Sequence, residues 1–168
     1  MRKFEIDYLP PSATTGEYPW AFPPNVDTVI RRLISGKVLH LFSGSSLIGE
    51  ERIDIEHPNA TQNMNVKEFI KLDDRDWDWV VLDPPYQITR TDAKLEGYGI
   101  KGAVSSDVIF RRSLKQYFQR HTENILWLDY TAPMIKGFKR EKLWLVLTGA
   151  FHQVRVLSWL KREMKPLL

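Results

Sequence analysis

The chain has 168 residues, of which 43% are hydrophobic and 27% are charged, and it contains no cysteine. This length and apolar content predict one globular domain and exclude a disordered chain, and the missing thiol excludes disulfides, thiolate metal sites and a cysteine nucleophile. No apolar run reaches the roughly 20 residues that span a bilayer, and the N-terminus has no apolar signal core. We therefore expect a cytoplasmic protein that makes no membrane contact.

The net charge of +3 is unevenly distributed along the chain. Residues 1–84 hold 9 Lys and Arg against 14 Asp and Glu, a charge of −5, whereas residues 85–168 hold 15 against 7, a charge of +8. This asymmetry fits either a chance distribution of solvated side chains or a second half that binds a polyanion. The four histidines show no metal-ligand spacing, so we expect no metal site.

In the first half of the chain, the pattern predicts a loop, a helix and then short buried strands. Residues 9–24 are rich in proline and aromatic residues and are typical of an ordered loop. A helix follows, with Asn25 as its N-cap, apolar residues at helical spacing and Gly36 at its C-terminal stop. Beyond it, apolar runs predict strands at residues 37–42, 52–55 and 79–82, with a helical turn after Asn65.

The second half begins with a long glycine-containing loop over residues 87–104. Ser105 or Ser106 then caps a helix with apolar positions at Val108, Ile109, Leu114, Tyr117 and Phe118. Three further strands follow at residues 125–128, 143–147 and 154–159, and the last two form an antiparallel pair around Gly149. The sequence therefore predicts an α/β fold, in which a mostly parallel sheet is covered on both faces and ends in an antiparallel C-terminal edge hairpin.

Several predicted strands end in residues that suit a ligand. In open α/β sheets, ligands bind beyond the carboxyl ends of the strands. Gly44 follows the first of these strands and would let a ligand approach the backbone, and Asp54 at the end of the next could accept hydrogen bonds from ribose hydroxyls. A turn glycine and a capping aspartate would explain the same two residues.

The segment Asp83-Pro84-Pro85-Tyr86, directly after an apolar strand, points to a more specific chemistry. The Asp83 carboxylate and the Pro84 carbonyl could accept both N–H bonds of an exocyclic amine on a base, which leaves the nitrogen lone pair free to attack a methyl group. The prolines fix the backbone and remove competing donors, and Tyr86 offers a flat face for an extruded base. A strand-terminating turn with an aromatic at its rim is the alternative.

This motif, downstream of a strand that ends in Phe-Ser-Gly, resembles that of the amino-methyltransferases that use S-adenosylmethionine to methylate adenine N6 or cytosine N4 in DNA. The resemblance covers about residues 15–160 and implies a Rossmann-like class I methyltransferase fold, with residues 1–168 as a single catalytic domain. It also implies that residues 83–86 form the catalytic motif. The cofactor-binding residues that it implies are Trp20, Phe42, Ser43, Gly44, Ser45, Asp54, Asn65 and Val66.

The chain departs from this family in its first cofactor motif. A serine stands where the family has a second glycine, and only nine residues separate Gly44 from Asp54, against roughly 20 in a dinucleotide-binding fingerprint. The helix that normally follows the first strand must therefore be reduced to a turn or loop.

The length leaves no room for a separate target-recognition domain, so substrate reading falls to residues 87–112, to a specificity partner or to a second copy of the chain. Basic residues interleaved with an aromatic are typical of a groove for phosphates and stacked bases, although a solvated loop has the same composition. The candidate substrate-binding residues are Arg90, Lys94, Tyr98, Lys101, Arg111 and Arg112.

The leading interpretation is methyl transfer from S-adenosylmethionine to adenine N6, with DNA favoured over RNA. Cytosine N4 is an open alternative, because the same motif serves both amines. The short length also fits the ribosomal-RNA guanine-N2 methyltransferases. A third alternative is a nucleic-acid-binding module of the same fold with impaired catalysis.

Overall fold

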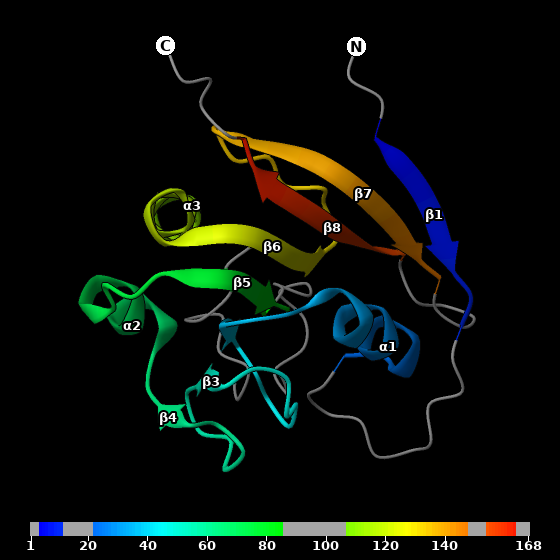
Figure 1. Ribbon diagram of the computed structural model, residues 1–168. Coiled ribbons are helices and arrows are strands. Elements are labelled where there is room, and N and C mark those ends of the chain that lie inside the picture. Colours follow the sequence, from blue (N-terminus) through cyan, green and yellow to red (C-terminus); the bar gives the residue numbers. More distant parts are fainter. Residues whose placement is uncertain (1–3, 12–21, 86–106, 148–153, 164–168) are drawn as a thin grey trace.

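One mixed sheet of eight strands organises the computed structural model, which describes residues 4–11, 22–85, 107–147 and 154–163 (Figure 1). The strands are β1 (Glu5–Leu9), β2 (Val38–Leu41), β3 (Glu51–Asp54), β4 (Gln62–Asn63), β5 (Trp77–Leu82), β6 (Thr122–Asp129), β7 (Phe138–Val146) and β8 (Arg155–Arg162). The described helices are α1 (Pro24–Leu33), α2 (Val66–Leu72) and α3 (Val108–His121). None of these described helices is long and apolar enough to cross a membrane.

The strand order is β1-β7-β8-β6-β5-β2-β3-β4. Every neighbouring pair is parallel except the two pairs that involve β8, which is antiparallel to both β6 and β7. The chain runs outward from β2 through β3 to β4 and then returns to place β5 on the other side of β2. These observations confirm the predicted α/β fold, its mostly parallel sheet and its C-terminal antiparallel pair.

The N-terminal strand β1 pairs with the outer side of β7 and was not expected from the sequence. Four of its five residues are exposed, including Ile6 and Tyr8, so it lacks the buried apolar run by which the other strands are recognised.

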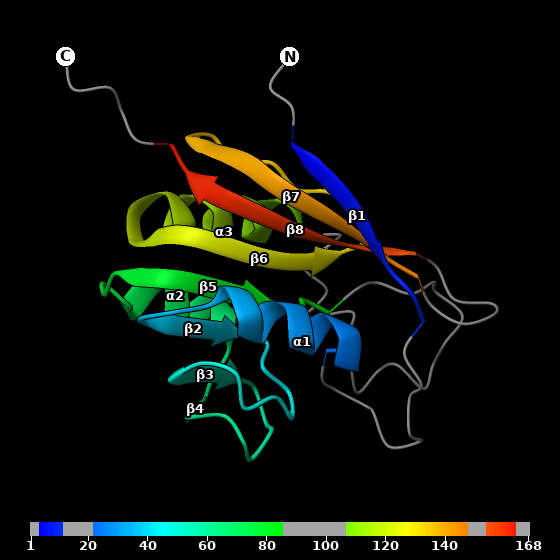
Figure 2. The same ribbon diagram turned by 45° about the vertical axis from the view of Figure 1, so that its right-hand side comes forward.

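Helices cover both faces of the sheet, with α1 on one face and α2 and α3 on the other (Figure 2). Alternate residues of a central strand therefore enter different cores, as β5 shows. Val80 and Leu82 pack with α2 and α3, whereas Trp79 and Val81 pack with α1. A strand that is buried on both faces has an unbroken apolar sequence, and this explains the short apolar runs of the central strands.

Two helix starts differ from their predictions. Asn25 is not the N-cap of α1: Pro23 is the cap and Pro24 is the first helical residue, a position that tolerates proline because its N–H would have no partner there. The N-cap of α3 is Asp107, not Ser105 or Ser106, and its carboxylate accepts a hydrogen bond of 2.9 Å from the Phe110 N–H. The expected helical turn after Asn65 is confirmed as α2.

Candidate functional site

The carboxyl ends of β2, β3, β5 and β6 meet at one edge of the sheet, because these strands are parallel. The start of β8 reaches the same edge, because β8 is antiparallel to β6. We call this the carboxyl edge and the opposite one the amino edge. The strand order reverses between β2 and β5, and open α/β sheets bind ligands beyond the carboxyl ends at such a switch point.

The connection from β2 to β3 contains no helix, as the short spacing between Gly44 and Asp54 predicts. Its backbone turns sharply, with positive φ values of 59° at Phe42 and 50° at Gly44. The Ser43 N–H donates to the Ile53 carbonyl at 3.0 Å, which ties the turn to the end of β3. A left-handed residue other than glycine costs about 1–2 kcal/mol, so Phe42 is a strained position of the kind that clusters at functional sites.

The Asp54 carboxylate joins the loops that follow β2 and β3. Its Oδ2 accepts from the Gly44 N–H at 2.9 Å, and its Oδ1 accepts from the N–H groups of Glu56 and His57 at 3.1 and 3.0 Å. An ionised carboxylate has about four lone-pair sites, so one acceptor site on Oδ2 is left within the described part of the chain. The sequence-predicted carboxylate therefore stands at the strand end, already oriented by three backbone amides.

Ile55 follows Asp54 directly and its side chain is 67% exposed. An apolar side chain next to an oriented carboxylate offers a flat ring a surface to cover. The sequence interpretation missed Ile55 because it assigned the residue to the strand over residues 52–55, whereas β3 ends at Asp54.

The remaining predicted cofactor residues that are described lie around the same loops. Ser43 is 1% exposed, and its Oγ has no hydrogen-bond partner among the described residues. The Ser45 carbonyl accepts from the Asn59 side chain at 2.9 Å. Asn65 is exposed and caps α2 by accepting from the Lys67 N–H, whereas Val66 is buried in the core.

Asp83 stands one residue beyond β5 and forms an ion pair with Arg155 at the start of β8. Arg155 Nη1 lies 3.1 Å from Asp83 Oδ2, and the two side chains are 17% and 21% exposed. Pro84 is buried and Pro85 is half-buried. The sequence interpretation missed Arg155, because a single arginine at a strand start belongs to no motif and reaches Asp83 only through the pairing of β8.

A second ion pair at the carboxyl edge involves Arg111, one of the predicted substrate-binding residues. Arg111 Nη1 lies 3.1 Å from Asp129 Oδ2, and its guanidinium lies 5.2 Å from the centre of the Trp127 ring. The Asp129 side chain is only 2% exposed, and its Oδ1 accepts from the Tyr130 N–H at 2.7 Å. Arg111 is thus engaged within the protein, whereas Arg112 is exposed on α3.

The other candidates of the sequence interpretation lie outside the described residues: Trp20, Tyr86, Arg90, Lys94, Tyr98 and Lys101.

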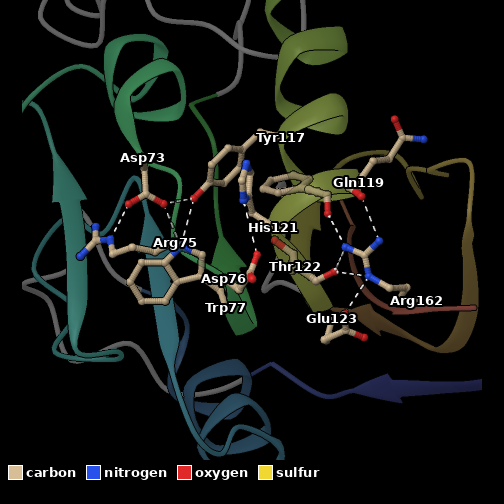
Figure 3. Close-up of polar contacts among 11 residues, drawn as sticks. Asp73, Arg75, Asp76, Trp77, Tyr117, Gln119, His121, Thr122, Glu123 and Arg162 are labelled. Atoms are coloured by element: carbon tan, nitrogen blue, oxygen red, sulfur yellow. Dashed lines mark hydrogen bonds and ion pairs between the residues drawn. The ribbon is translucent and has the colours of Figure 1, made fainter. Parts of the chain in front are cut away.

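The amino edge contains a polar cluster of a different kind (Figure 3). Asp73 Oδ2 accepts from the Tyr117 hydroxyl at 2.5 Å and from Trp77 Nε1 at 3.0 Å, and Asp73 Oδ1 accepts from Arg75 Nε at 2.5 Å. Burial, followed by the hydrogen bond to Asp73, raises the pKa of Tyr117 above its ordinary value, so the hydroxyl stays protonated and donates. We call these four residues the Asp73 cluster.

Arg162, at the end of β8, completes the amino edge. Its guanidinium donates to the Phe118, Gln119 and Thr122 carbonyls, at 2.5–3.1 Å, where α3 ends and β6 begins (Figure 3). The last carbonyls of a helix have no partner within it, so Arg162 acts as a cap from another strand.

Within the described residues, no three His, Asp or Glu side chains lie close enough together to bind a metal ion. No protein-family model matches the chain, and no curated protein matches it either.

Proposed function

We propose that the protein is an S-adenosylmethionine-dependent methyltransferase of the Rossmann-like class I fold, which acts on an exocyclic amine of a nucleic-acid base, adenine N6 in DNA. The observation that carries the proposal is the position of Asp83-Pro84-Pro85. The segment lies at the carboxyl end of β5, next to the switch point where Gly44 and Asp54 follow the neighbouring strands.

The residues at the ends of β2 and β3 fit a nucleoside cofactor. Asp54 Oδ2 keeps an acceptor site suited to a ribose hydroxyl, and the exposed Ile55 offers an apolar surface beside it. When bound, the cofactor supplies an electrophilic methyl group.

The protein's own contribution to the reaction is to hold the amine. The Asp83 carboxylate and the Pro84 carbonyl accept its two N–H bonds, so the nitrogen lone pair points away from both acceptors. Neither proline has an N–H that could compete, and the rings restrict the backbone that carries the two acceptors. As the nitrogen gains a methyl group it becomes positively charged, and the Asp83 carboxylate stabilises that charge until the proton leaves.

The proposal is tested by incubating the purified protein with methyl-labelled S-adenosylmethionine and unmethylated DNA or RNA, followed by mass spectrometry of the released nucleosides. We expect N6-methyladenine in DNA. Asp83→Ala should lower the rate by about 100-fold or more, because it removes an acceptor positioned on the reacting nitrogen. Asp74→Ala, which removes an exposed carboxylate near the amino edge, is the matched control and should leave the rate unchanged. Unmodified nucleic acid, or full activity of Asp83→Ala, would contradict the proposal.

The same assay separates the alternative products. N4-methylcytosine in DNA or N2-methylguanine in RNA would retain the chemistry and change the substrate, because the two acceptors suit any exocyclic amine.

A catalytically impaired nucleic-acid-binding module is the second candidate. It is favoured by the absence of a helix after β2 and by the ion pair that occupies Asp83. Calorimetry distinguishes the two, since one-to-one binding of S-adenosylmethionine would exclude a module without a cofactor site.

A further inference from the structure

We propose that Arg155 is a positioning residue that holds the Asp83 carboxylate in the orientation that accepts the target amine; this inference rests on the proposed function. The motivating contact joins Arg155 Nη1 and Asp83 Oδ2 at 3.1 Å. It links residues 72 positions apart in the chain, so it forms only in the folded sheet.

The ion pair crosses an entire strand. β5 and β8 are not neighbours, because β6 lies between them and pairs with both. Adjacent strands lie about 4.8 Å apart, so β5 and β8 are separated by about 10 Å. Only a long side chain reaches over that distance, and arginine is the long cation whose planar group matches a carboxylate.

The register places Arg155 on the α1 face of the sheet. Arg155 lies opposite Val146 of β7, and both Val146 and Leu157, two residues along β8, pack in the core beneath α1. Leu128 of β6 packs in the same core. The guanidinium therefore reaches Asp83 over a buried apolar surface, where a carboxylate without a cation would be costly.

The two ion pairs of the carboxyl edge have different exposures. Asp129, which pairs with Arg111, is 2% exposed and its other oxygen accepts a backbone N–H. Asp83 retains 21% exposure, so a ligand can approach a carboxylate that Arg155 already orients. Fixing an acceptor before the substrate arrives lowers the barrier, and a displacement of about 1 Å can cost about 100-fold in rate.

The experiment compares Arg155→Ala and Arg155→Lys in the wild-type background and in an Asp83→Asn background. Methyl transfer to DNA is measured as kcat and KM for each. We expect Arg155→Ala to lower kcat by about 100-fold with KM for DNA unchanged. Arg155→Lys should lose less activity, since lysine keeps the positive charge but lacks the planar guanidinium that can donate two parallel hydrogen bonds. In the Asp83→Asn background, Arg155→Ala should change kcat by less than about threefold, because interacting residues are not additive.

The matched control is Arg31→Ala, which removes an arginine from another Arg–Asp pair, with Asp27 at 2.7 Å on α1. It should leave kcat unchanged. If Arg155→Ala does not fold, Arg155→Lys and Arg155→Gln replace it, with activity expressed per folded molecule by circular dichroism.

Three outcomes would overturn the inference. A wild-type kcat in Arg155→Ala would show that the Arg155–Asp83 ion pair does not contribute to methyl transfer. A raised, salt-dependent KM at normal kcat would identify Arg155 as a phosphate contact instead. An equal loss of kcat in both backgrounds would indicate a general structural role. Absence of product in every protein, wild type included, is a different result: it refutes the proposed function, and this inference with it.

Discussion

Asp73 at the amino edge differs in exposure from Asp54 and Asp83 at the carboxyl edge. At the amino edge, the Asp73 carboxylate is 4% exposed, and its hydrogen bonds come from the other members of the Asp73 cluster (Figure 3). At the carboxyl edge, Asp54 accepts from three backbone amides and Asp83 pairs with the Arg155 guanidinium, and both carboxylates are partly exposed. A closed set of hydrogen bonds serves stability, whereas an oriented acceptor that is still accessible can serve a ligand.

The backbone shows the same difference. Gly137, near the amino edge, has a φ of 86°, which glycine adopts without strain. At the carboxyl edge a phenylalanine, Phe42, takes a left-handed conformation. It is the one non-glycine residue with positive φ in the part of the chain that the structure describes, and it lies directly in front of Ser43 and Gly44.

The largest expected effect separates stability from function. Asp73→Ala removes the charged acceptor of two buried donors, the Tyr117 hydroxyl and Trp77 Nε1, while Arg75 keeps its ion pair with Glu51, and we expect a loss of about 4 kcal/mol in the free energy of unfolding. Urea denaturation measures this loss, and methyl transfer per folded molecule should not change. Asp74→Ala, at an exposed neighbouring position, should change stability by less than about 0.5 kcal/mol. A similarly small effect of Asp73→Ala would remove the distinction between the edges.

A somewhat smaller effect should appear on acidification, through His40 in β2. Burial lowers the pKa of His40 from 6.5 to about 4, and its Nδ1 lies 3.3 Å from the carbonyl of Ile48 in the loop of the carboxyl edge. The unfolded chain takes up this proton near pH 6.5, but the folded protein only near pH 4. This contribution to stability is therefore complete above pH 6.5 and is lost as the pH falls toward 4, by about 3 kcal/mol.

Denaturation curves between pH 7 and 4 measure this dependence. His40→Gln should flatten it, because the buried imidazole that resists protonation is removed. An unchanged slope in His40→Gln would show that other groups account for the acid sensitivity.

The smallest expected effect compares two glycines of similar conformation. Gly44→Ala and Gly137→Ala both force alanine to a positive φ and should each cost about 1 kcal/mol of stability. An added Cβ at Gly137 meets nothing within 4 Å, so that variant reports the backbone strain alone. Calorimetry with S-adenosylmethionine should find weaker binding only in Gly44→Ala. Equal binding by both variants would argue against a cofactor at the β2 turn.

The buried strands and the shortened connection after β2 were predictable, because continuous apolar runs and a nine-residue spacing are local signals. Strand β1 was not, because its side chains are mostly exposed and its pairing with β7 is a tertiary contact. At the candidate site, Gly44, Asp54 and Asp83 could be selected from their positions after apolar runs. Arg155 could not, since its contact with Asp83 depends on the antiparallel register of β8.

Strand β8 contributes an arginine to each edge, Arg155 at its first residue and Arg162 at its last. The two lie an odd number of residues apart, so they project to opposite faces, one toward Asp83 and the other toward the end of α3. A slip of one residue in the pairing of β8 would turn both away from their partners at once. During synthesis, neither the Arg155–Asp83 ion pair nor the hydrogen bonds from Arg162 to the end of α3 can form until residues 155–162 have left the ribosome. Arg155 therefore orients the Asp83 carboxylate only in a chain whose sheet is already complete.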